Sequence, residues 1–589
     1  MVETPLFFSV RAQIFRSVAT LLLASGILLN AAVAQDFPPV SYPKDYFRNP
    51  LNIPISLSGN FGELRPNHFH MGLDLKTQAR ENLPVHAAAE GYIARVKVEP
   101  GGFGRAIYIN HPNGMTTLYA HLNDFYPELE KYVREQQYKQ ESWSVYLEIP
   151  EGAFPVRKGQ FIAYSGNTGG SEGPHLHFEI RETATDKCIN PMLFGLPITD
   201  NVAPTILRLS LYDRARSIYE QAPLIVPVKR VGNRYTTTPA VISTSLEKVS
   251  FAITSFDMHT GSTNLNGIYS AVMYDNNQPV QGFRMEKIGY EDTRYLNAHI
   301  DYRTKSNGGP WLQHLSELPG YINSIYRSYS GNTGVIDLTD GRVHNIRIEV
   351  KDADGNSAVL SFGIKKTTAY KAPAKPAGRM FYPLMIDVYE SEDLEFFIGE
   401  KCLYDSVHIH HIRTNSSAPG IVSASHTIGA GHIPLQEYFT VRIKPNRNLS
   451  EEEKSRVIMQ RITGAKKRVA NVSWQQEGWA SARFRDFGLF RLVLDTVPPV
   501  IVPVGFTDAN AKTYLKTARR MVFTVKDNYD QFVNFRAELD GKWLRFTNDK
   551  GRNFIYIFDE YCGPGAHELK ISVEDVAGNR TEKIYRFER

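Results

Sequence analysis

The sequence predicts a mainly β protein, built from antiparallel sheets and divided into several domains. Short apolar runs alternate with turn residues over residues 83–120, as in an antiparallel sheet. In the rest of the chain a strand-like segment recurs in register, which is typical of repeated β modules. The chain of 589 residues is too long for one hydrophobic core, since cores stop growing near about 250 to 300 residues. We therefore expect about three or four domains.

Composition and charge narrow the class of protein. Hydrophobic residues make up 42% of the chain and charged residues 22%, which indicates compact folding rather than disorder. The 67 basic and 62 acidic residues are interspersed, so we expect no nucleic-acid partner. The three cysteines, Cys188, Cys402 and Cys562, are too far apart in sequence to form a disulfide or zinc framework, and we expect them to be buried and inert.

The N-terminus predicts a cleavable export signal over residues 1–34. Arg11 and Arg16 precede an apolar run at 18–29, and an Ala-Val-Ala pattern closes at Ala34. A retained membrane anchor is the alternative, but the apolar run is short. No later stretch has the length and apolarity of a spanning helix. We therefore expect a mature protein that does not span the membrane and is exported to the periplasm, the cell envelope or the extracellular space.

Residues 35–198 are predicted to form an antiparallel-sheet domain that one helix interrupts. Residues 92–98 and 106–110 are β-rich and are bounded by Pro-Gly and Asn-Gly turn signals. Between Asp124 and Gln140 apolar residues recur at helical spacing, and Asp124 is a candidate N-cap. We expect this inserted helix to narrow the substrate groove, with packing on the far side of the domain as the alternative.

Beyond this domain, two units share a repeated sequence. Residues 344–356 align without a gap against residues 567–579, and each segment ends in Asp-x-x-Gly-Asn. The units also begin alike, with Asp-Asn-Val-Ala-Pro at 200–204 and Asp-Thr-Val-Pro-Pro at 495–499. Alternating strands closed by such a turn resemble the immunoglobulin-like β-sandwich modules of bacterial surface proteins.

The repeat divides the remaining chain into three parts. We expect an Ig-like β-sandwich with an insertion at 199–370, a β-rich module at 371–494 and an Ig-like β-sandwich at 495–589. These parts are called the first, middle and last modules. Envelope proteins are candidate partners of all three.

Histidines concentrate in the N-terminal domain, where 7 of the 17 lie between positions 68 and 177. His70 and Asp74 form one grouping, and His175 and His177 form another. Residues two apart in a strand point the same way, so one of these two histidines could bind a metal while the other meets the substrate. Imidazole and carboxylate are a ligand set suited to zinc, and three protein ligands leave a fourth position for water.

Four ordered motifs resemble those of the lysostaphin/LytM-type zinc endopeptidases. They are His70-Met-Gly-Leu-Asp74, Tyr119-Ala-His121-Leu122, Ser165-Gly-Asn-Thr-Gly169 and Gly173-Pro-His-Leu-His-Phe-Glu179. The resemblance covers roughly residues 62–181 and implies a peptidase domain with a duplicated hybrid motif. It also implies that His70, Asp74 and His177 bind Zn²⁺, while His121 and His175 are unliganded catalytic histidines.

This resemblance implies an exported zinc metalloendopeptidase that hydrolyses the peptide cross-links of peptidoglycan. A zinc-activated water would attack the peptide bond with the assistance of His121 and His175, whose separate roles the sequence does not divide. One alternative is an extracellular zinc protease that acts on glycine-rich proteins. Another is a noncatalytic cell-envelope binding or activator protein, which the complete set of five residues disfavours.

Two further features lie beside or outside the motifs. Glu179 shares a strand face with His175 and His177, so it is either a carboxylate that orients a ligand or an ordinary solvated or paired one. The run His408-Ile-His410-His411 would also place two histidines on one strand face. It lacks the accompanying motifs, so we expect a structural or surface role for it.

Overall fold

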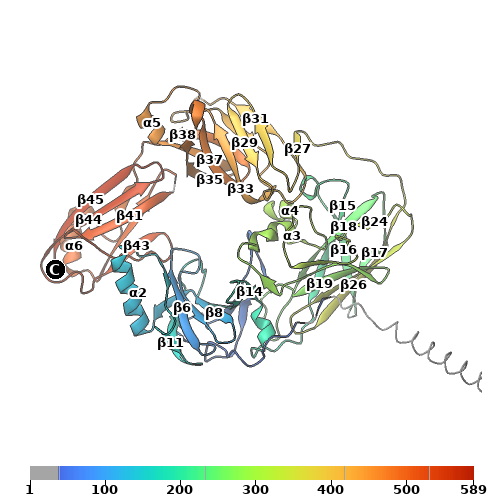
Figure 1. Ribbon diagram of the computed structural model, residues 1–589, viewed down its shortest axis with the longest axis horizontal. Coiled ribbons are helices and arrows are strands. Elements are labelled where there is room, and N and C mark those ends of the chain that lie inside the picture. The colour runs from blue at the N-terminus through green and yellow to red at the C-terminus, as the bar shows by residue number, and fades with distance from the viewer. Residues whose placement is uncertain (1–36, 39, 233, 417, 530) are drawn as a thin grey trace, which may run out of the picture. The chain divides into compact units, whose positions relative to one another are not determined.

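The computed structural model describes residues 37–589 except 39, 233, 417 and 530 (Figure 1). The predicted signal segment, residues 1–34, lies outside the described residues. Strands dominate the described part of the chain, which confirms the mainly β prediction. A helix long and apolar enough to cross a membrane is not found among these residues.

The N-terminal region carries two larger sheets, a two-stranded sheet of β2 and β3, and one long helix. Its elements are β1 (Leu57–Gly59), β2 (Leu64–Arg65), β3 (His68–Phe69), β4 (Leu73–Lys76), β5 (Pro84–His86), β6 (Gly91–Val98), β7 (Arg105–Asn110), β8 (Met115–Ala120), β9 (Leu122–Phe125), α2 (Pro127–Lys139), β10 (Val145–Glu148), β11 (Pro155–Val156), β12 (Phe161–Ser165), β13 (His175–Glu182), β14 (Cys188–Ile189) and the 3-10 helix η1 (Pro191–Phe194).

The main sheet of this region runs in the order β1-β4-β13-β8-β7-β6-β10, and a smaller sheet runs β5-β12-β9. Strands β6 and β7 confirm the two β-rich segments expected from the sequence. In the antiparallel register, His177 on β13 lies opposite Asp74 on β4 and opposite Ala120 on β8. Strand pairing therefore brings three motifs together although they are far apart along the chain.

Helix α2 starts three residues later than its predicted cap. Asp124 belongs to β9, which pairs with β12. Tyr126 occupies the N-cap position of the helix without a side-chain capping bond, and proline lies in the first turn. Proline suits this position because its fixed φ matches the helix and its missing N–H costs nothing there. The buried helix residues Leu129 and Val133 join the core of the N-terminal region.

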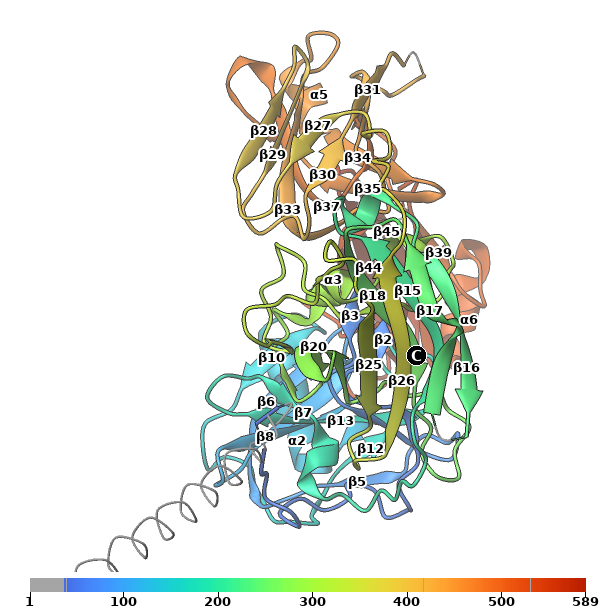
Figure 2. The same cartoon turned by 90° about the vertical axis from the view of Figure 1, so that its right-hand side faces the viewer.

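The first module contains one large sheet and a short helical insertion. Its elements are β15 (Thr205–Asp213), η2 (Ile218–Glu220), β16 (Leu224–Val231), β17 (Arg234–Thr244), β18 (Lys248–Phe256), β19 (Ser270–Asp275), β20 (Gln278–Arg284), β21 (Lys287–Ile288), η3 (Thr293–Tyr295), α3 (Leu296–His299), α4 (Tyr302–Ser306), β22 (Gln313–His314), β23 (Tyr326–Ser328), β24 (Ile336–Asp337), β25 (His344–Lys351) and β26 (Ser357–Lys366). The long strands β25 and β26 run side by side (Figure 2). Strand β21 pairs with β14, so the sheet of the N-terminal region continues into this module.

The middle module is built from two five-stranded sheets and a two-stranded pair. Its elements are β27 (Arg379–Phe381), β28 (Asp387–Glu390), β29 (Leu394–Ile398), β30 (Val407–Ile409), β31 (His411–Thr414), β32 (Ser425–Ile428), β33 (Pro434–Ile443), α5 (Glu451–Ser455), β34 (Val457–Thr463), β35 (Lys466–Asn471), β36 (Ser473–Trp474), η4 (Gln476–Gly478), β37 (Ala480–Asp486) and β38 (Gly488–Leu494). The histidine run at 408–411 does not form one strand, because it crosses from β30 to β31, and these strands belong to different sheets.

The last module is formed by a three-stranded and a four-stranded sheet. Its elements are β39 (Val500–Pro503), η5 (Asp508–Asn510), α6 (Ala511–Thr517), β40 (Arg520–Lys526), β41 (Phe532–Leu539), β42 (Lys542–Trp543), β43 (Asn553–Ile557), β44 (Ala566–Asp575) and β45 (Arg580–Glu588). The repeated segments occupy equivalent places, since each forms one strand of a β-hairpin, β25–β26 in the first module and β44–β45 in the last. The turn glycines Gly355 and Gly578 have φ of 96° and 79°, a conformation that favours glycine.

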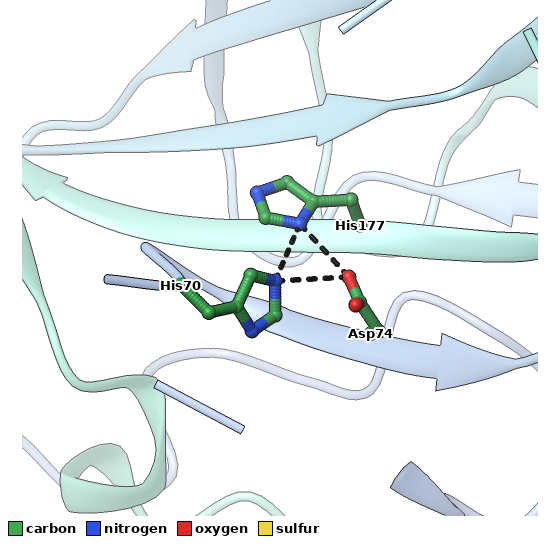
Figure 3. Close-up of side chains that lie close together, drawn as sticks. All are labelled: His70, Asp74 and His177. Atoms are coloured by element: carbon green, nitrogen blue, oxygen red, sulfur yellow. Dashed lines mark hydrogen bonds and ion pairs between the residues drawn. The ribbon is translucent and has the colours of Figure 1, made fainter. Parts of the chain in front are cut away.

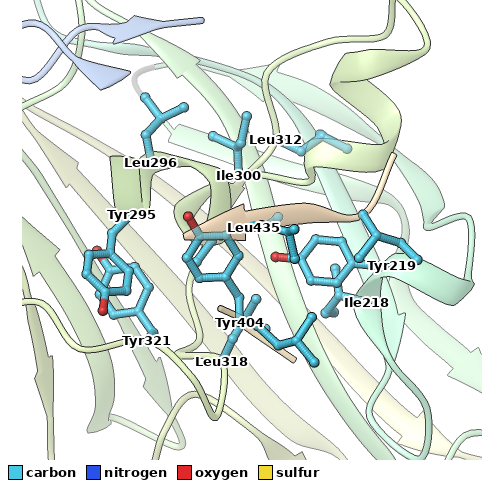
Figure 4. Packing of buried hydrophobic residues seen from close by; sticks show 14 of the residues in the cluster. Ile218, Tyr219, Tyr295, Leu296, Ile300, Leu312, Leu318, Tyr321, Tyr404 and Leu435 are labelled. Carbon is cyan, nitrogen blue, oxygen red and sulfur yellow. The ribbon is translucent and has the colours of Figure 1, made fainter. Parts of the chain in front are cut away.

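Buried aromatic and aliphatic side chains connect the first and middle modules. Tyr295 and Tyr321 of the first module lie close to Tyr404 and Leu435 of the middle module within one hydrophobic cluster (Figure 4). The ring centres of Tyr295 and Tyr404 are 5.8 Å apart. The three cysteines are free and buried, as expected from their spacing.

Candidate metal centre

Three predicted ligand side chains converge beside the main sheet (Figure 3). His70 Nε2 is 3.0 Å from Asp74 Oδ1, and His177 Nδ1 is 2.9 Å from the same oxygen. The two ring nitrogens are themselves 3.0 Å apart. All three residues are buried, with exposed fractions of 5% or less. The strand register of β4 and β13 thus produces a compact group of two imidazoles and one carboxylate.

In His70 and His177, the ring nitrogen that faces away from Asp74 makes a hydrogen bond that holds the imidazole in place. His70 Nδ1–H donates to the carbonyl oxygen of Asn60 at 2.8 Å, and His177 Nε2–H donates to Glu179 Oε1 at 2.8 Å. A neutral imidazole has only one N–H, so these bonds leave lone pairs on His70 Nε2 and His177 Nδ1. Such backing fixes the ring and the tautomer of a metal-binding histidine.

The neutral side chains therefore direct two nitrogen lone pairs and one carboxylate oxygen at a common point. Acceptors this close repel one another unless a proton or a cation lies among them. Zn²⁺ binds nitrogen together with carboxylate oxygen, whereas Ca²⁺ and Mg²⁺ bind oxygen. The donor set present in this chain fits a metal ion of the zinc type.

The two other predicted histidines flank this centre. His121 follows β8 with a φ of 60°, and its Nδ1–H donates to the carbonyl oxygen of Thr168 at 2.9 Å. His175 Nδ1–H donates to the carbonyl oxygen of Gly173 at 2.8 Å, and its Nε2 lies 3.4 Å from Asp74 Oδ1. The ring centres of His121 and His175 are 4.8 Å apart. All five predicted site residues thus lie together, and each neutral flanking ring keeps a lone pair on Nε2.

Burial and neighbouring charges set the protonation of the group. Burial lowers the pKa of His70 to about 4, and burial together with His177 and His175 lowers that of His121 to about 3. Burial alone would raise the pKa of Asp74, but His70 and hydrogen bonds from the histidines hold it well below its usual range. Burial also opposes charge on His177, yet Asp74 and Glu179 raise its pKa to about 9. A cation at this centre therefore competes with a proton on His177.

Glu179 is both paired and oriented toward a predicted ligand. It is fully buried, and its Oε2 accepts from Arg181 Nε at 2.7 Å and from Cys188 Sγ at 3.2 Å. Its Oε1 accepts from His177 and from the hydroxyl of Tyr290 at 2.5 Å. Burial raises the pKa of Glu179, but Arg181 and His177 together hold it below its usual value. An ionised Glu179 therefore fixes the tautomer of His177.

Several residues that support the centre were not predicted from the sequence. Arg65 forms an ion pair with Asp74, and Asn60 holds His70. Asn60 is itself held by the first module, because its side chain exchanges two hydrogen bonds of 2.8 Å with the backbone of Gly267. Tyr290 also comes from the first module. Long-range folding alone brings Gly267 and Tyr290 here, so no local sequence signal could reveal them.

The last module contacts the loops that hold the flanking histidines. The backbone oxygen of Asp549 accepts from the N–H of Gly169 at 3.1 Å, and Lys550 Nζ donates to the carbonyl oxygen of Ser171 at 2.7 Å. Gly169 follows Thr168, which binds His121, and Ser171 hydrogen-bonds His175 through its hydroxyl at 3.2 Å. This module therefore touches the support of both histidines.

A cavity of about 940 Å³ lies between α2 and the last module. Pro127, Glu130 and Arg134 of α2 line it, together with Thr168, Asp549 and Tyr561. The helix thus buries one face in the core of the N-terminal region and turns another toward a space that reaches Thr168.

Two family models match this chain. The model of Peptidase family M23 matches residues 68–138 and 144–191, which include all five predicted site residues. The model of the Zu5-like domain matches residues 380–495, nearly the whole of the middle module. The expected resemblance of the N-terminal region is thereby confirmed at the level of its domain.

Curated relatives are similar over the same region. DD-carboxypeptidase/endopeptidase Mpg of Neisseria meningitidis is 35% identical over 128 residues, which are 22% of this chain and 23% of that protein. An uncharacterized metalloprotease of Haemophilus influenzae is 30% identical over 29% of this chain and 32% of its own length. Peptidoglycan DD-endopeptidase ShyA of Vibrio cholerae is 26% identical over 28% of this chain and 33% of its own. The similarity therefore spans at most a third of each of these relatives.

Proposed function

We propose, from the M23 domain at residues 68–191, that this protein is an exported zinc endopeptidase that cleaves peptide cross-links of peptidoglycan. His70, Asp74 and His177 would hold the Zn²⁺ ion. His121 and His175 would act as the unliganded histidines that handle protons and negative charge. The modules that follow would position the enzyme in the envelope.

One observation carries this proposal. In the neutral rings, the nitrogens of His70 and His177 that face Asp74 are the ones left without a proton, because Asn60 and Glu179 take the outer N–H groups. A histidine pair with a purely structural role has no need to turn its lone pairs toward a carboxylate, because this arrangement costs electrostatic energy unless a proton or a cation lies among the acceptors.

The flanking histidines have the geometry for proton transfer. When bound, Zn²⁺ supplies a Lewis acid that polarises a carbonyl group and lowers the pKa of water. His121 is neutral at neutral pH, since its pKa is about 3, and its free Nε2 can accept a proton while Thr168 fixes the ring. His175 presents Nε2 in the same way through Gly173. After protonation, either ring can donate a hydrogen bond to a developing oxyanion.

Peptidoglycan is the substrate that the relatives favour. The names of two of them describe a carboxypeptidase/endopeptidase and a peptidoglycan endopeptidase. The predicted export signal at 1–34 would deliver the chain to that polymer.

Digestion of purified peptidoglycan by the zinc-loaded chain without residues 1–34 tests the function. Mass spectrometry of the products should show cross-linked peptides converted to uncross-linked ones, with intact glycan bonds. A glycine-rich polypeptide offered in parallel separates a murein hydrolase from a general extracellular protease.

Two variants control the digestion. Asp74→Ala should release no peptide, because the carboxylate at the centre is lost. His86→Ala removes a histidine of the same domain that lies outside the centre and should leave the products unchanged. Cleavage of glycan bonds, or no product from folded and zinc-loaded protein, would overturn the proposal.

A further inference from the structure

Aspartates occupy the same three places in the two repeated units. One opens the unit, one directly follows the strand β18 or β40, and one begins the Asp-x-x-Gly-Asn turn. These places hold Asp200, Asp257 and Asp352 in the first module and Asp495, Asp527 and Asp575 in the last. We call each set an aspartate corner.

The corner of the first module is fixed by hydrogen bonds between its beginning and its end. Asp200 Oδ1 accepts from the N–H of Val202 at 3.0 Å. The Nδ2 group of Asn356 donates to the backbone oxygen of Asp200 at 3.2 Å and to Asp352 Oδ2 at 2.7 Å. The opening aspartate is thus tied to the closing turn.

The corner of the last module repeats these bonds one by one. Asp495 Oδ1 accepts from the N–H of Val497 at 3.1 Å. The Nδ2 group of Asn579 donates to the backbone oxygen of Asp495 at 3.0 Å and to Asp575 Oδ2 at 2.9 Å. The same local structure therefore forms twice from separate stretches of chain.

Carboxylates crowd together in both corners. One side-chain atom each of Asp495, Asp527 and Asp575 lie within 4.8 Å of one another. Asp200 and Asp257 meet the same limit together with His259. Like charges this close, in surroundings that are largely buried, repel strongly unless a proton or a cation neutralises them.

A neutral amide oxygen adds an independent sign of a missing ligand. Asn266 lies directly opposite Asp257 in an antiparallel bridge, so the two side chains share one face. Asn266 is 2% exposed, and its Oδ1 finds no donor among the residues that the structure describes. A buried acceptor without a donor is costly, and such groups call for an explanation.

Carboxylate oxygens of the corners share this condition. Asp257 Oδ1 and Asp200 Oδ2 have no hydrogen-bond donor within the described part of the chain, and Asp257 is 2% exposed. In the last module, Asp527 Oδ1 is in the same state. In both corners, therefore, the aspartate that follows the strand, Asp257 or Asp527, has one carboxylate oxygen without a hydrogen-bond donor.

His259 offers no free nitrogen lone pair to a metal ion in the first corner. The Nδ2 group of Asn266 lies 3.4 Å from His259 Nδ1 and can donate to it, which leaves the imidazole proton on Nε2. His259 Nε2 lies 4.0 Å from the Asp257 carboxylate. In this tautomer the free acceptors of the corner are oxygens only.

We propose that each aspartate corner binds a Ca²⁺ ion. Ca²⁺ takes six to eight oxygen ligands from carboxylates, amide and backbone carbonyls and water, at flexible geometry. Zn²⁺ prefers nitrogen and sulfur, and Mg²⁺ usually keeps most of its water. The corners thus differ in kind from the centre at His70, where nitrogen lone pairs converge.

The position of the corners gives such an ion a structural task. Asp200 directly follows the N-terminal region, and Asp495 directly follows the middle module. A cation held there ties the first residues of each module to the end of one strand and to the closing turn. Ca²⁺ would therefore fix the segment by which each repeated module joins the preceding part of the chain.

Isothermal titration with CaCl₂ tests the proposal on the zinc-loaded chain without residues 1–34, in metal-free buffer. Two Ca²⁺ should bind per chain, with dissociation constants on the order of 10⁻⁴ to 10⁻³ M, as in extracellular calcium modules. Asp257→Asn and Asp527→Asn should each bind one Ca²⁺, and the double variant none. MgCl₂ at the same concentrations should give no comparable binding.

A control variant and the second copy of the site show whether a loss of Ca²⁺ binding is specific to the corners. Asp337→Asn removes an exposed carboxylate of the first module and should still bind two Ca²⁺. Should Asp257→Asn fail to fold, Asp527→Asn tests the proposal in the other copy. Absence of Ca²⁺ binding by the parent chain would overturn the proposal, as would two bound Ca²⁺ in the double variant.

Discussion

Two histidine groups in this protein differ in where their lone pairs point. In the middle module, His411 Nε2 lies 3.0 Å from His426 Nδ1, and the hydroxyl of Tyr389 lies 3.0 Å from His411 Nδ1. Tyr389 can donate to His411 Nδ1, and His411 Nε2–H can donate to His426 Nδ1, while His426 Nε2 has no hydrogen-bond partner among the described residues. Both acceptor nitrogens of this group are therefore matched with donors.

The group at His70 and His177 has the opposite arrangement. When its rings are neutral, the N–H groups point outward to Asn60 and Glu179, and the lone pairs point inward to the Asp74 carboxylate. His411 is half-buried whereas the other three rings are buried, and both groups bring imidazoles to about hydrogen-bond distance. The direction of the free lone pairs therefore distinguishes a metal site from a structural histidine pair better than the number of histidines does.

The largest effect is expected from His70→Ala. The parent chain should bind about one zinc per molecule, and the variant should lose most of it together with all detectable peptide release, because one of three ligands is gone. Elemental analysis of dialysed, folded protein measures this directly. His86→Ala serves as the control and should keep its zinc. Full zinc occupancy in folded His70→Ala protein would remove His70 from the centre.

His121→Ala should separate metal binding from chemistry. The variant should keep zinc and fold, but lose about 10² to 10⁴ in kcat, the usual contribution of a positioned acid or base. Steady-state kinetics on a soluble cross-linked muropeptide, with zinc content measured on the same sample, makes the distinction. Near-parental turnover would show that His121 plays no part in proton transfer.

Glu179→Gln tests whether the hydrogen bond from His177 to an ionised Glu179 strengthens zinc binding. The substitution keeps the size of the side chain but removes the charge that favours the His177 tautomer, so zinc affinity should fall about 10-fold to 100-fold. Competition with a chromophoric chelator measures the change. Glu182→Gln, on the same strand, is the matched control and should bind zinc as the parent does. Equal affinities of the two variants would mean that Glu179 serves only to pair with Arg181.

The five site residues could be predicted because they lie in short, ordered motifs that resemble those of a known peptidase family. His175 and His177 share a strand face, and the antiparallel pairing of β13 with β4 places Asp74 opposite His177. The β-rich segments at 92–98 and 106–110 were equally accessible, since alternating runs bounded by turns need no long-range information.

The contacts that support the metal centre from the first module could not be predicted from the sequence, because they form only in the folded protein. Tyr290 and Gly267 reach the centre only after the first module has folded against the N-terminal region, and neither lies in a motif. The start of α2 was misplaced because pairing of β9 with β12 holds Asp124 in a strand. The run at 408–411 was taken as one strand, although it passes from one sheet to another at His410.

The smallest effect on catalysis is expected from His411→Ala, which removes one ring of the middle-module pair. Zinc content and kcat should match the parent, because the two acceptor nitrogens there, His411 Nδ1 and His426 Nδ1, are already matched with donors. Stability should nevertheless fall by about 1 to 3 kcal/mol, since the buried His426 Nδ1 loses its donor. Urea unfolding followed by tryptophan fluorescence, with zinc analysis of the folded protein, measures both quantities. A loss of zinc from His411→Ala would mean that this pair also holds a metal, and the direction of the lone pairs would then cease to distinguish the two groups.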